Sequence, residues 1–255
     1  MADTSMDMVM EGNRWPLNGW ADLHCHVLPG MDDGCGDCEE SAAVLTESLK
    51  QGIRGIAATP HYYPTESVER FLERRLQSYE KLRRYLDGQE LETPEICLGA
   101  EVAYRTGISR EPLLEKLCYG SSGYLLLELP FQRWSRSVLQ EIRMIRNVRG
   151  ITPVIAHLER YLKFQDKKTL SELFDMDVCI QMNAGYLLGR WTRSRAKRMI
   201  RNGVIQILGS DCHNMETRLP NLGMAVRQME KSRLSREAEE IRRFGMEIFQ
   251  EAVNN

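Results

Sequence analysis

The stretch DLHCHVLPGMDD, residues 22–33, places two histidines two positions apart and two adjacent acids shortly after them. In a β-strand, side chains at positions i and i+2 point to the same face of the sheet. His24 and His26 would therefore project together from the end of a strand. Imidazole and carboxylate groups are common metal ligands, although a lone histidine near a strand end is more often a hydrogen-bonded packing residue.

Residues 21–26, which include both histidines, form the first of seven short runs that we interpret as strands. Amphipathic segments with helical periodicity separate these runs. Most runs are almost wholly apolar until their last residues, which is typical of parallel strands covered on both faces. The predicted strands are residues 21–26, 55–61, 95–102, 124–130, 152–157, 178–185 and 204–211. The predicted helices are residues 37–52, 67–88, 135–150, 167–177 and 192–203, with two more at the C-terminal end.

The alternation of β and α segments predicts one α/β domain over residues 20–255, preceded by an N-terminal extension of residues 1–19. The sequence has no linker rich in Pro, Gly or Ser and no internal repeat. Seven βα units fit a closed or nearly closed barrel better than an open sheet, although the pattern alone does not separate the two. Right-handed crossovers would place the strand C-termini on one face, which carries the chemistry in such barrels.

Composition excludes several classes of protein. The 34 basic and 36 acidic residues give a net charge of −2, so no overall positive field would gather nucleic acid or an anionic membrane. No segment offers the roughly 18 consecutive apolar residues of a membrane span, and the first 20 residues do not resemble a signal peptide. We therefore expect a cytoplasmic protein. The seven scattered cysteines suit reduced thiols, and the one CxxC, at Cys35 and Cys38, has no second pair to complete a zinc site.

Polar residues of unusual chemistry stand where the apolar runs end. They include all five histidines of the chain, which packing alone does not readily explain. Five imidazoles and four carboxylates exceed the needs of one ion and suit two or three divalent metals with bridging carboxylates. Such N/O sites accept Mn²⁺, Fe²⁺ or Zn²⁺ without choosing among them. The candidate ligands are His24, His26, Asp33, His61, Glu101, Glu128, His157, Asp211 and His213.

Glu128 is the most informative of the acids because it interrupts the apolar run YLLLELP, residues 124–130. Burying a carboxylate without a partner would cost several kcal/mol. A metal ion beside Glu128 would remove that cost, and a buried ion pair with an arginine is the alternative explanation.

Taken together, these segments resemble the PHP (polymerase and histidinol phosphatase) superfamily, and within it the manganese-dependent tyrosine-protein phosphatases of bacterial capsule and exopolysaccharide loci. The similarity extends from about residue 20 to residue 220 and so covers most of the chain. The matching segments are DLHCHVLPGMDDG, EESAAVLTESLKQGI, ATPH, GAEV, LLLELP, GITPVIAHLERY and GSDCHN, followed by Arg218 and Pro220.

The resemblance implies a distorted, TIM-like (β/α)₇ barrel with three divalent ions, Mn²⁺ being the expected metal and Fe or Zn the alternatives. It assigns one ion to His24, His26, Glu101 and Asp211, with Glu101 bridging to a second ion held by Glu128 and His157. The third ion would be held by Asp33, His61 and His213. Arg160 and Arg218 would contact the phosphate, for which their forked guanidinium groups are suited.

Two departures from the family pattern are an additional N-terminal segment, with a regulatory or a packing role, and a changed loop that bears on substrate choice. About 19 residues precede the DLHCH segment, whereas the family usually begins almost at it. Tyr62 and Tyr63 follow ATPH, where the family commonly has a histidine or a basic residue. Aromatic residues near the predicted rim could receive a phenol ring and its flanking peptide, although at least half of them should be packing residues. These are Tyr62, Tyr63, Phe131, Trp134 and Trp191.

The implied reaction is hydrolysis of phosphotyrosine on a protein, expected to be a bacterial tyrosine kinase, by attack of a metal-bound hydroxide. Asp33, or a histidine near the third ion such as His61, would protonate the leaving phenoxide. Two alternatives stay open, a histidinol-phosphate or other small-molecule phosphomonoesterase and a non-catalytic metal-stabilised scaffold that binds a kinase. The C-x₅-R spacing of Cys212 and Arg218 also occurs in cysteine-dependent phosphatases, but its loop has no glycine, and we interpret it as coincidence.

Overall fold

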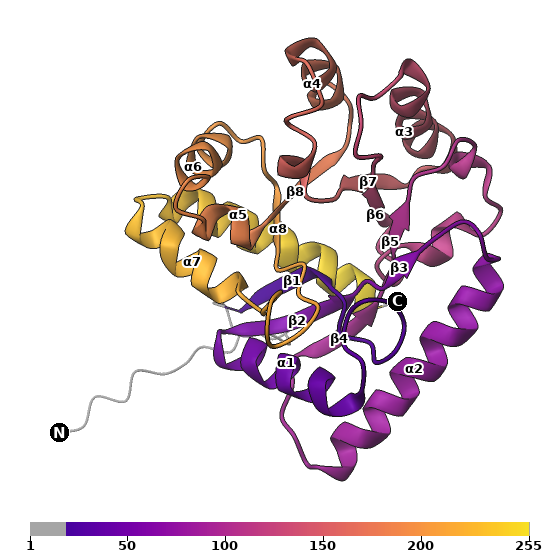
Figure 1. Cartoon of the computed structure of the whole chain (residues 1–255), viewed down its shortest axis with the longest axis vertical. Helices are drawn as coiled ribbons and strands as arrows, with labels where there is room; N and C mark the ends of the chain where they lie inside the picture. The colour runs from indigo at the N-terminus through magenta and orange to yellow at the C-terminus, as the bar shows by residue number, and fades with distance from the viewer. Residues whose placement is uncertain (1–18, 255) are drawn as a thin grey trace.

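The computed structural model describes residues 19–254, and within them a curled, parallel β-sheet is surrounded by helices (Figure 1). The predicted N-terminal extension therefore lies outside the described residues except for Gly19. The strands are β1 (Trp20–Cys25), β2 (Ile53–Ala58), β3 (His61–Tyr62), β4 (Glu95–Leu98), β5 (Glu101–Ala103), β6 (Tyr124–Glu128), β7 (Thr152–Ile155), β8 (Cys179–Asn183) and β9 (Ile207–Gly209).

Every strand pair is parallel, with the orders β1-β2-β4 and β3-β5-β6-β7-β8-β9. The predicted strands 55–61 and 95–102 are each interrupted, giving β2 and β3 from one and β4 and β5 from the other. The ladder crosses both breaks, because the Gly99 N–H donates to Ala58 O over 2.9 Å and the Glu101 N–H donates to Pro60 O over 3.0 Å. Each of the seven predicted runs thus contains a strand.

The helices begin largely where the sequence predicts. In α1, Asp37 is the N-cap and accepts from the Glu40 N–H over 2.9 Å. The α-helices are α1 (Cys38–Lys50), α2 (Val68–Gly88), α3 (Arg136–Arg149), α4 (Lys167–Phe174), α5 (Ala184–Leu188), α6 (Arg193–Arg201), α7 (Leu222–Lys231) and α8 (Ser235–Val253). Three 3₁₀ turns are η1 (Ile108–Arg110), η2 (Leu114–Leu117) and η3 (Leu158–Arg160). The prediction of strand to residue 185 was wrong, since α5 begins at Ala184.

Two apolar cores stabilise this arrangement. The larger one lies between the sheet and its surrounding helices, and the smaller one fills the inside of the curl. Helix α8 closes the inner core, where the Phe249 ring packs on Gly55 near the start of β2. The end of the sheet where the strands begin is therefore covered by apolar side chains, and the polar residues gather where the strands end.

The segment after β9 returns to the end of β1. The Asp211 N–H donates to His24 O and the His26 N–H donates to Cys212 O, each over 2.8 Å. These two bonds bring the motifs DLHCH and GSDCH side by side, although almost 190 residues separate them in sequence. Within residues 19–254, no helix is both long and apolar enough to span a membrane.

Candidate metal centre

The first group of candidate ligands lies between the end of β1 and the neighbouring strands. His24, His26, Glu101 and Asp211 place one donor atom each within 4.8 Å of one another. Glu101 Oε2 lies 3.2 Å from both His24 Nε2 and His26 Nε2. Asp211 Oδ1 lies 3.4 Å from His24 Nε2 and 3.6 Å from His26 Nε2. The structure therefore brings together the four residues that the sequence analysis assigned to one ion.

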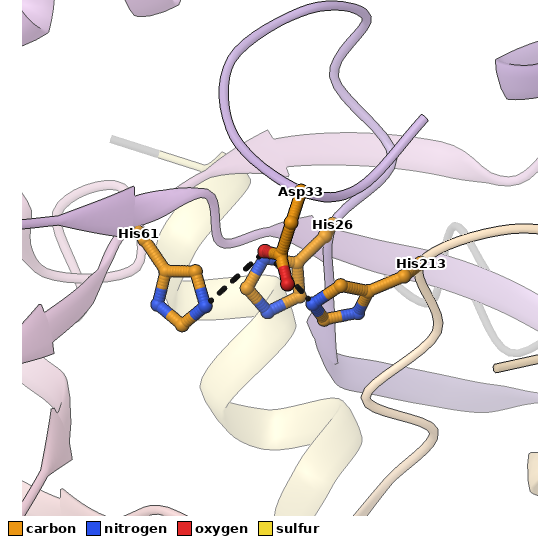
Figure 2. Close-up of side chains that lie close together, drawn as sticks. All are labelled: His26, Asp33, His61 and His213. Atoms are coloured by element: carbon orange, nitrogen blue, oxygen red, sulfur yellow. Dashed lines mark ion pairs between the residues drawn. The ribbon is translucent and has the colours of Figure 1, made fainter. Parts of the chain in front are cut away.

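A second group combines His26 with Asp33, His61 and His213, again within 4.8 Å (Figure 2). Asp33 reaches over the histidines from the loop after β1, and its Oδ1 lies 3.5 Å from His61 Nε2 and 3.3 Å from His213 Nε2. The Asp33 side chain is 66% exposed, whereas His213 is almost fully buried. The structure thus brings together the three residues predicted to share an ion and adds His26 to them.

The third group differs from the prediction in one member. Its residues are His61, Glu101 and Glu128, whereas the sequence analysis placed His157 with the two glutamates. His61 is brought there because it pairs with Glu101 in the parallel register of β3 and β5. His157 still lies beside both acids, with its Nε2 2.8 Å from Glu101 Oε1 and 3.5 Å from Glu128 Oε1.

Burial and charge act against each other on these groups. Burial would lower the pKa of His26, but hydrogen bonds with Asp32 and Glu101 outweigh it and raise the pKa to about 10. Burial would raise the pKa of Glu101, yet the neighbouring His24 and His157 hold it well below its ordinary value. Since cations compete with protons for such donors, metal affinity should fall at low pH.

His213 shows the opposite shift. Burial, followed by the positive charges of His26 and Arg218, lowers its pKa to about 4. Neutral imidazole is the form that binds a metal. At neutral pH, His213 therefore presents a lone pair to the second group without first losing a proton.

The donor set fits divalent cations. His61 Nδ1 and His213 Nε2 are buried and have no hydrogen-bond partner, although each lies near a carboxylate. Buried polar atoms normally have such partners, so unpaired nitrogens are expected where a ligand completes their coordination. His157 and Asp211 also have positive φ angles of 35° and 53°. Such angles are uncommon in residues other than glycine, and they occur preferentially at functional sites. In the described part of the chain, none of the candidate donor groups includes a cysteine.

The two predicted phosphate-contacting arginines border the donor cluster. Arg160 and Arg218 each donate through Nη2 to Asp211 over 2.5 Å, to different oxygens of its carboxylate. Their side chains are 37% and 33% exposed, so part of each guanidinium group faces solvent. An anion bound over the donor cluster would meet two fixed positive charges.

Asp32 was not among the predicted site residues, yet it supports two candidate ligands at once. Its Oδ2 lies 2.7 Å from His26 Nδ1 and accepts from the His61 backbone N–H over 2.7 Å. These hydrogen bonds, acting against burial, lower its pKa to about 2. Carboxylates that orient a metal-binding imidazole in this way are common around metal centres. The signal was present in the adjacent acids of the DLHCHVLPGMDD stretch, of which only Asp33 was assigned a role.

Strand β8 also contributes polar residues that the sequence analysis did not assign. Gln181 Oε1 accepts from the His157 N–H over 2.5 Å and lies 3.4 Å from His24 Nδ1. Asn183 Nδ2 donates to Asp211 Oδ2 over 2.7 Å. The two residues have the same i, i+2 spacing as His24 and His26, which is the signal that could have identified them.

Glu159 was missed as well. It follows His157 in the turn after β7, and its carboxylate accepts from the Asn183 N–H at 3.3 and 3.4 Å. Burial raises the pKa of Glu159 to about 7. Burial thus favours the neutral form of this carboxyl, which lies two residues from His157 in the sequence.

The aromatic candidates divide into two kinds. Tyr62 and Trp134 are buried and pack in the larger core, whereas Tyr63, Phe131 and Trp191 are exposed. Tyr63 stacks on His61 with ring centroids 5.3 Å apart, and Phe131 stacks on His157 at 5.9 Å. Two exposed aromatic rings thus lie directly against candidate ligands.

The structure does not favour a cysteine nucleophile. Cys212 is 1% exposed, and its thiol donates to Asn214 O at 3.7 Å. It also meets Cys25, and that hydrogen bond together with burial raises the pKa of Cys25. Arg218, the other half of the C-x₅-R spacing, pairs with Asp211 instead.

A family model described as capsular polysaccharide synthesis, CpsB/CapC, matches residues 20–246. The chain belongs to the CpsB/CapC family. Tyrosine-protein phosphatase YwqE of Bacillus subtilis is 30% identical over 226 residues, which are 82% of this chain and 84% of that protein. Tyrosine-protein phosphatase CpsB of Streptococcus pneumoniae is 30% identical over 242 residues, 86% and 93% of the two chains.

Solved structures agree with this assignment. A chain from the crystal structures of Bacillus subtilis YwqE and Streptococcus pneumoniae CpsB, described as unique metal-dependent tyrosine phosphatases, superimposes with a TM-score of 0.79. It is 25% identical, and the match covers 91% of this chain and 94% of that one. The phosphotriesterase homology protein of Escherichia coli, at 11% identity and a TM-score of 0.51, shares the fold; the match covers 92% and 100% of the chains.

Proposed function

We propose that the protein is a metal-dependent protein-tyrosine phosphatase that acts on a phosphorylated protein, expected to be a tyrosine kinase of a capsule or exopolysaccharide locus. The observation that carries the proposal is the convergence of five imidazoles, four carboxylates and two arginines at the strand ends. The CpsB and YwqE relatives, named as tyrosine-protein phosphatases, support the substrate class.

We assign three divalent ions, expected to be Mn²⁺, to this centre. His24, His26, Glu101 and Asp211 would hold the first, and Glu101, Glu128 and His157 would hold the second. Asp33, His61 and His213 would hold the third, and the proximity of His26 supports this position. When bound, the ions would supply Lewis acidity and the activation of a water molecule.

The residues of the chain would orient the ester and neutralise its charge. Arg160 and Arg218 flank the cluster, paired with Asp211, and would bind the phosphate oxygens, stabilising charge that builds up during transfer. Asp33 or His61, at the open side of the cluster, would donate a proton to the leaving oxygen. A phenoxide, whose parent phenol has a pKa of about 10, needs less protonation as it leaves than an alkoxide does.

Three further proposals concern the whole chain. The curled sheet would form a distorted (β/α)₇ barrel, because each of seven predicted runs contains a strand and β1 is bonded to the segment after β9. Residues 20–255 would form a single PHP phosphoesterase domain after an extension of residues 1–19. The protein would act in the cytoplasm.

The test is metal removal and replacement on the purified protein, with phosphotyrosine peptide and histidinol phosphate as parallel substrates. Chelation should abolish phosphotyrosine hydrolysis, Mn²⁺ should restore it, and elemental analysis should give up to three ions per chain. Preference for histidinol phosphate would support the small-molecule phosphatase alternative. Binding of a phosphorylated kinase without turnover by the metal-loaded protein would support the scaffold alternative.

A further inference from the structure

A pocket of about 490 Å³ opens beside Arg160, at the edge of the proposed phosphate site. Its walls come from the loop after β6, the η3 turn with the loop that follows it, and α5. The lining residues are Phe131, Glu159, Arg160, Lys163, Phe164 and Tyr186. The pocket therefore shares Arg160 with the proposed phosphate site and extends away from it between aromatic side chains.

Phe131 connects the pocket to the metal centre. Its ring stacks on His157 at an interplanar angle of 22° and packs against Tyr161 with ring centroids 5.3 Å apart. It nevertheless remains 47% exposed, so part of the ring is accessible to another ring. An exposed phenylalanine held in place by two buried rings is a prepared aromatic surface.

The charges around the pocket suit an ester whose phosphate lies at the metal centre. The Arg160 guanidinium contacts Asp211 on the side of the cluster, and the Lys163 ammonium lies 4.8 Å above the Phe164 ring. Glu159 is the acid in the lining, and its carboxylate is turned toward the Asn183 N–H. The remaining walls, Phe164 and Tyr186, are half-buried aromatic residues.

We infer that this pocket receives the phenyl ring of the phosphotyrosine, with Phe131 and Tyr186 as the residues that select an aryl ester. The inference rests on the proposed function and supplies what the metal centre lacks, because ions and arginines recognise any phosphate equally. Burial of a ring between aromatic walls stabilises aryl ligands over alkyl ones. The Tyr63 ring, stacked on His61, is an alternative aromatic surface for the substrate ring.

Binding is best measured with two unreactive ligands, phenylphosphonate and methylphosphonate, as competitive inhibitors of the Mn²⁺-loaded full chain. Phenylphosphonate should bind the wild type about tenfold more tightly, a ratio of the size expected for one aromatic contact with its buried area. Phe131→Ala and Tyr186→Ala should each reduce the ratio severalfold while leaving methylphosphonate binding and metal content unchanged. Phe174→Ala, which removes an exposed ring on α4, is the matched control and should keep the wild-type ratio.

An unchanged ratio in both pocket variants would overturn the inference, as would a ratio that collapses only in Tyr63→Ala. Should Phe131→Ala lose metal through its contact with His157, Tyr186→Ala carries the test from a different element. Phosphotyrosine turnover by the wild type distinguishes a failure of the pocket inference from a failure of the proposed function. An active wild type with unaffected pocket variants contradicts only the pocket, whereas an inactive metal-loaded wild type contradicts the proposed function.

Discussion

Neighbouring residues around the proposed centre have opposite environments. Asp211 faces the imidazoles and accepts from two arginines, whereas Cys212 packs behind it against Cys25. Cys25 has the same position between His24 and His26. In β1 the alternation of side chains along the strand produces this arrangement. On the second segment Asp211 has a φ angle of 53°, and the bridge between Cys25 and Cys212 aligns this segment with β1.

Single substitutions of Asp211 and Cys212 test which of the two residues takes part in the reaction. Asp211→Asn should reduce phosphotyrosine hydrolysis by more than about 100-fold, because it removes a charged ligand and the anchor of Arg160 and Arg218. Cys212→Ser should retain most of the activity. Loss of activity in Cys212→Ser with full metal content would instead support a mechanism with Cys212 as the nucleophile.

Asp32 provides a second test at this scale. Asp32→Asn keeps the size of the side chain but weakens the support of His26 and His61, so metal affinity should fall by about 10- to 100-fold. Titration of Mn²⁺ into the chelated protein measures this directly. Asp87→Asn, at the exposed end of α2, is the control and should bind Mn²⁺ as the wild type does. Equal affinity in Asp32→Asn would show that the carboxylate does not position the histidines.

At the scale of elements, the turns at the strand ends are held by side chains of the surrounding helices. Glu141, on α3, accepts from the backbone N–H groups of Gly107 and Ser109 over 2.9 and 3.2 Å. These bonds secure the start of η1, the 3₁₀ turn after β5, to the helix beside it. Burial would raise the pKa of Glu141, but the bonds from Ser109 and Gly107 outweigh it and hold the pKa below its ordinary value.

This lowered pKa predicts a pH-dependent contribution to stability. The folded state favours ionised Glu141, so its contribution is complete above the ordinary pKa of 4.5 and is lost as pH falls through the lower folded-state value. Glu141→Gln should cost about 1 kcal/mol of unfolding free energy at pH 7 and progressively less below pH 4.5. Urea unfolding at both pH values measures the difference. Glu247→Gln, exposed on α8, should cost little at either pH, and a pH-independent loss in Glu141→Gln would contradict this account.

At the scale of the whole molecule, the two ends of the sheet have different roles. Helix α8 covers the end where the strands begin, and its Phe249 ring lies so close to Gly55 that a Cβ there would be 2.6 Å from it. The opposite end carries the donor cluster. Stability and chemistry are thereby separated, as they are in barrel enzymes.

This separation predicts a stability defect without a defect in the site. Phe249→Ala should destabilise the fold by about 3–5 kcal/mol, because it empties a fully buried position of the inner core. The folded fraction should keep its Mn²⁺ affinity, since α8 does not contribute a candidate ligand. Val148→Ala, at a 70% exposed position, should be nearly neutral in thermal unfolding. Lost metal binding in fully folded Phe249→Ala would show that the two ends are coupled.

The sequence alone was sufficient to predict the alternating elements and the family. Both depend on local patterns: apolar runs with a polar last residue, caps such as Asp37, and short motifs such as HxH. The run 124–130 is recognisable from the sequence alone as a strand that carries an acid, and Glu128 is the half-buried last residue of β6. A strand prescribes its own alternation, so its polar face is evident without its neighbours.

Only the tertiary structure showed which donors and supporting residues had been left out of the predicted groups. The register of β3 against β5 brought His61, in addition to His157, to Glu101, and the folding back of one loop brought Asp32 under His26. The aromatic pocket arose in the same way, from three segments that are distant in the sequence. Such contacts depend on the pairing of separate strands and on loop conformation, and these interactions between distant parts of the chain leave no periodic signal in the sequence.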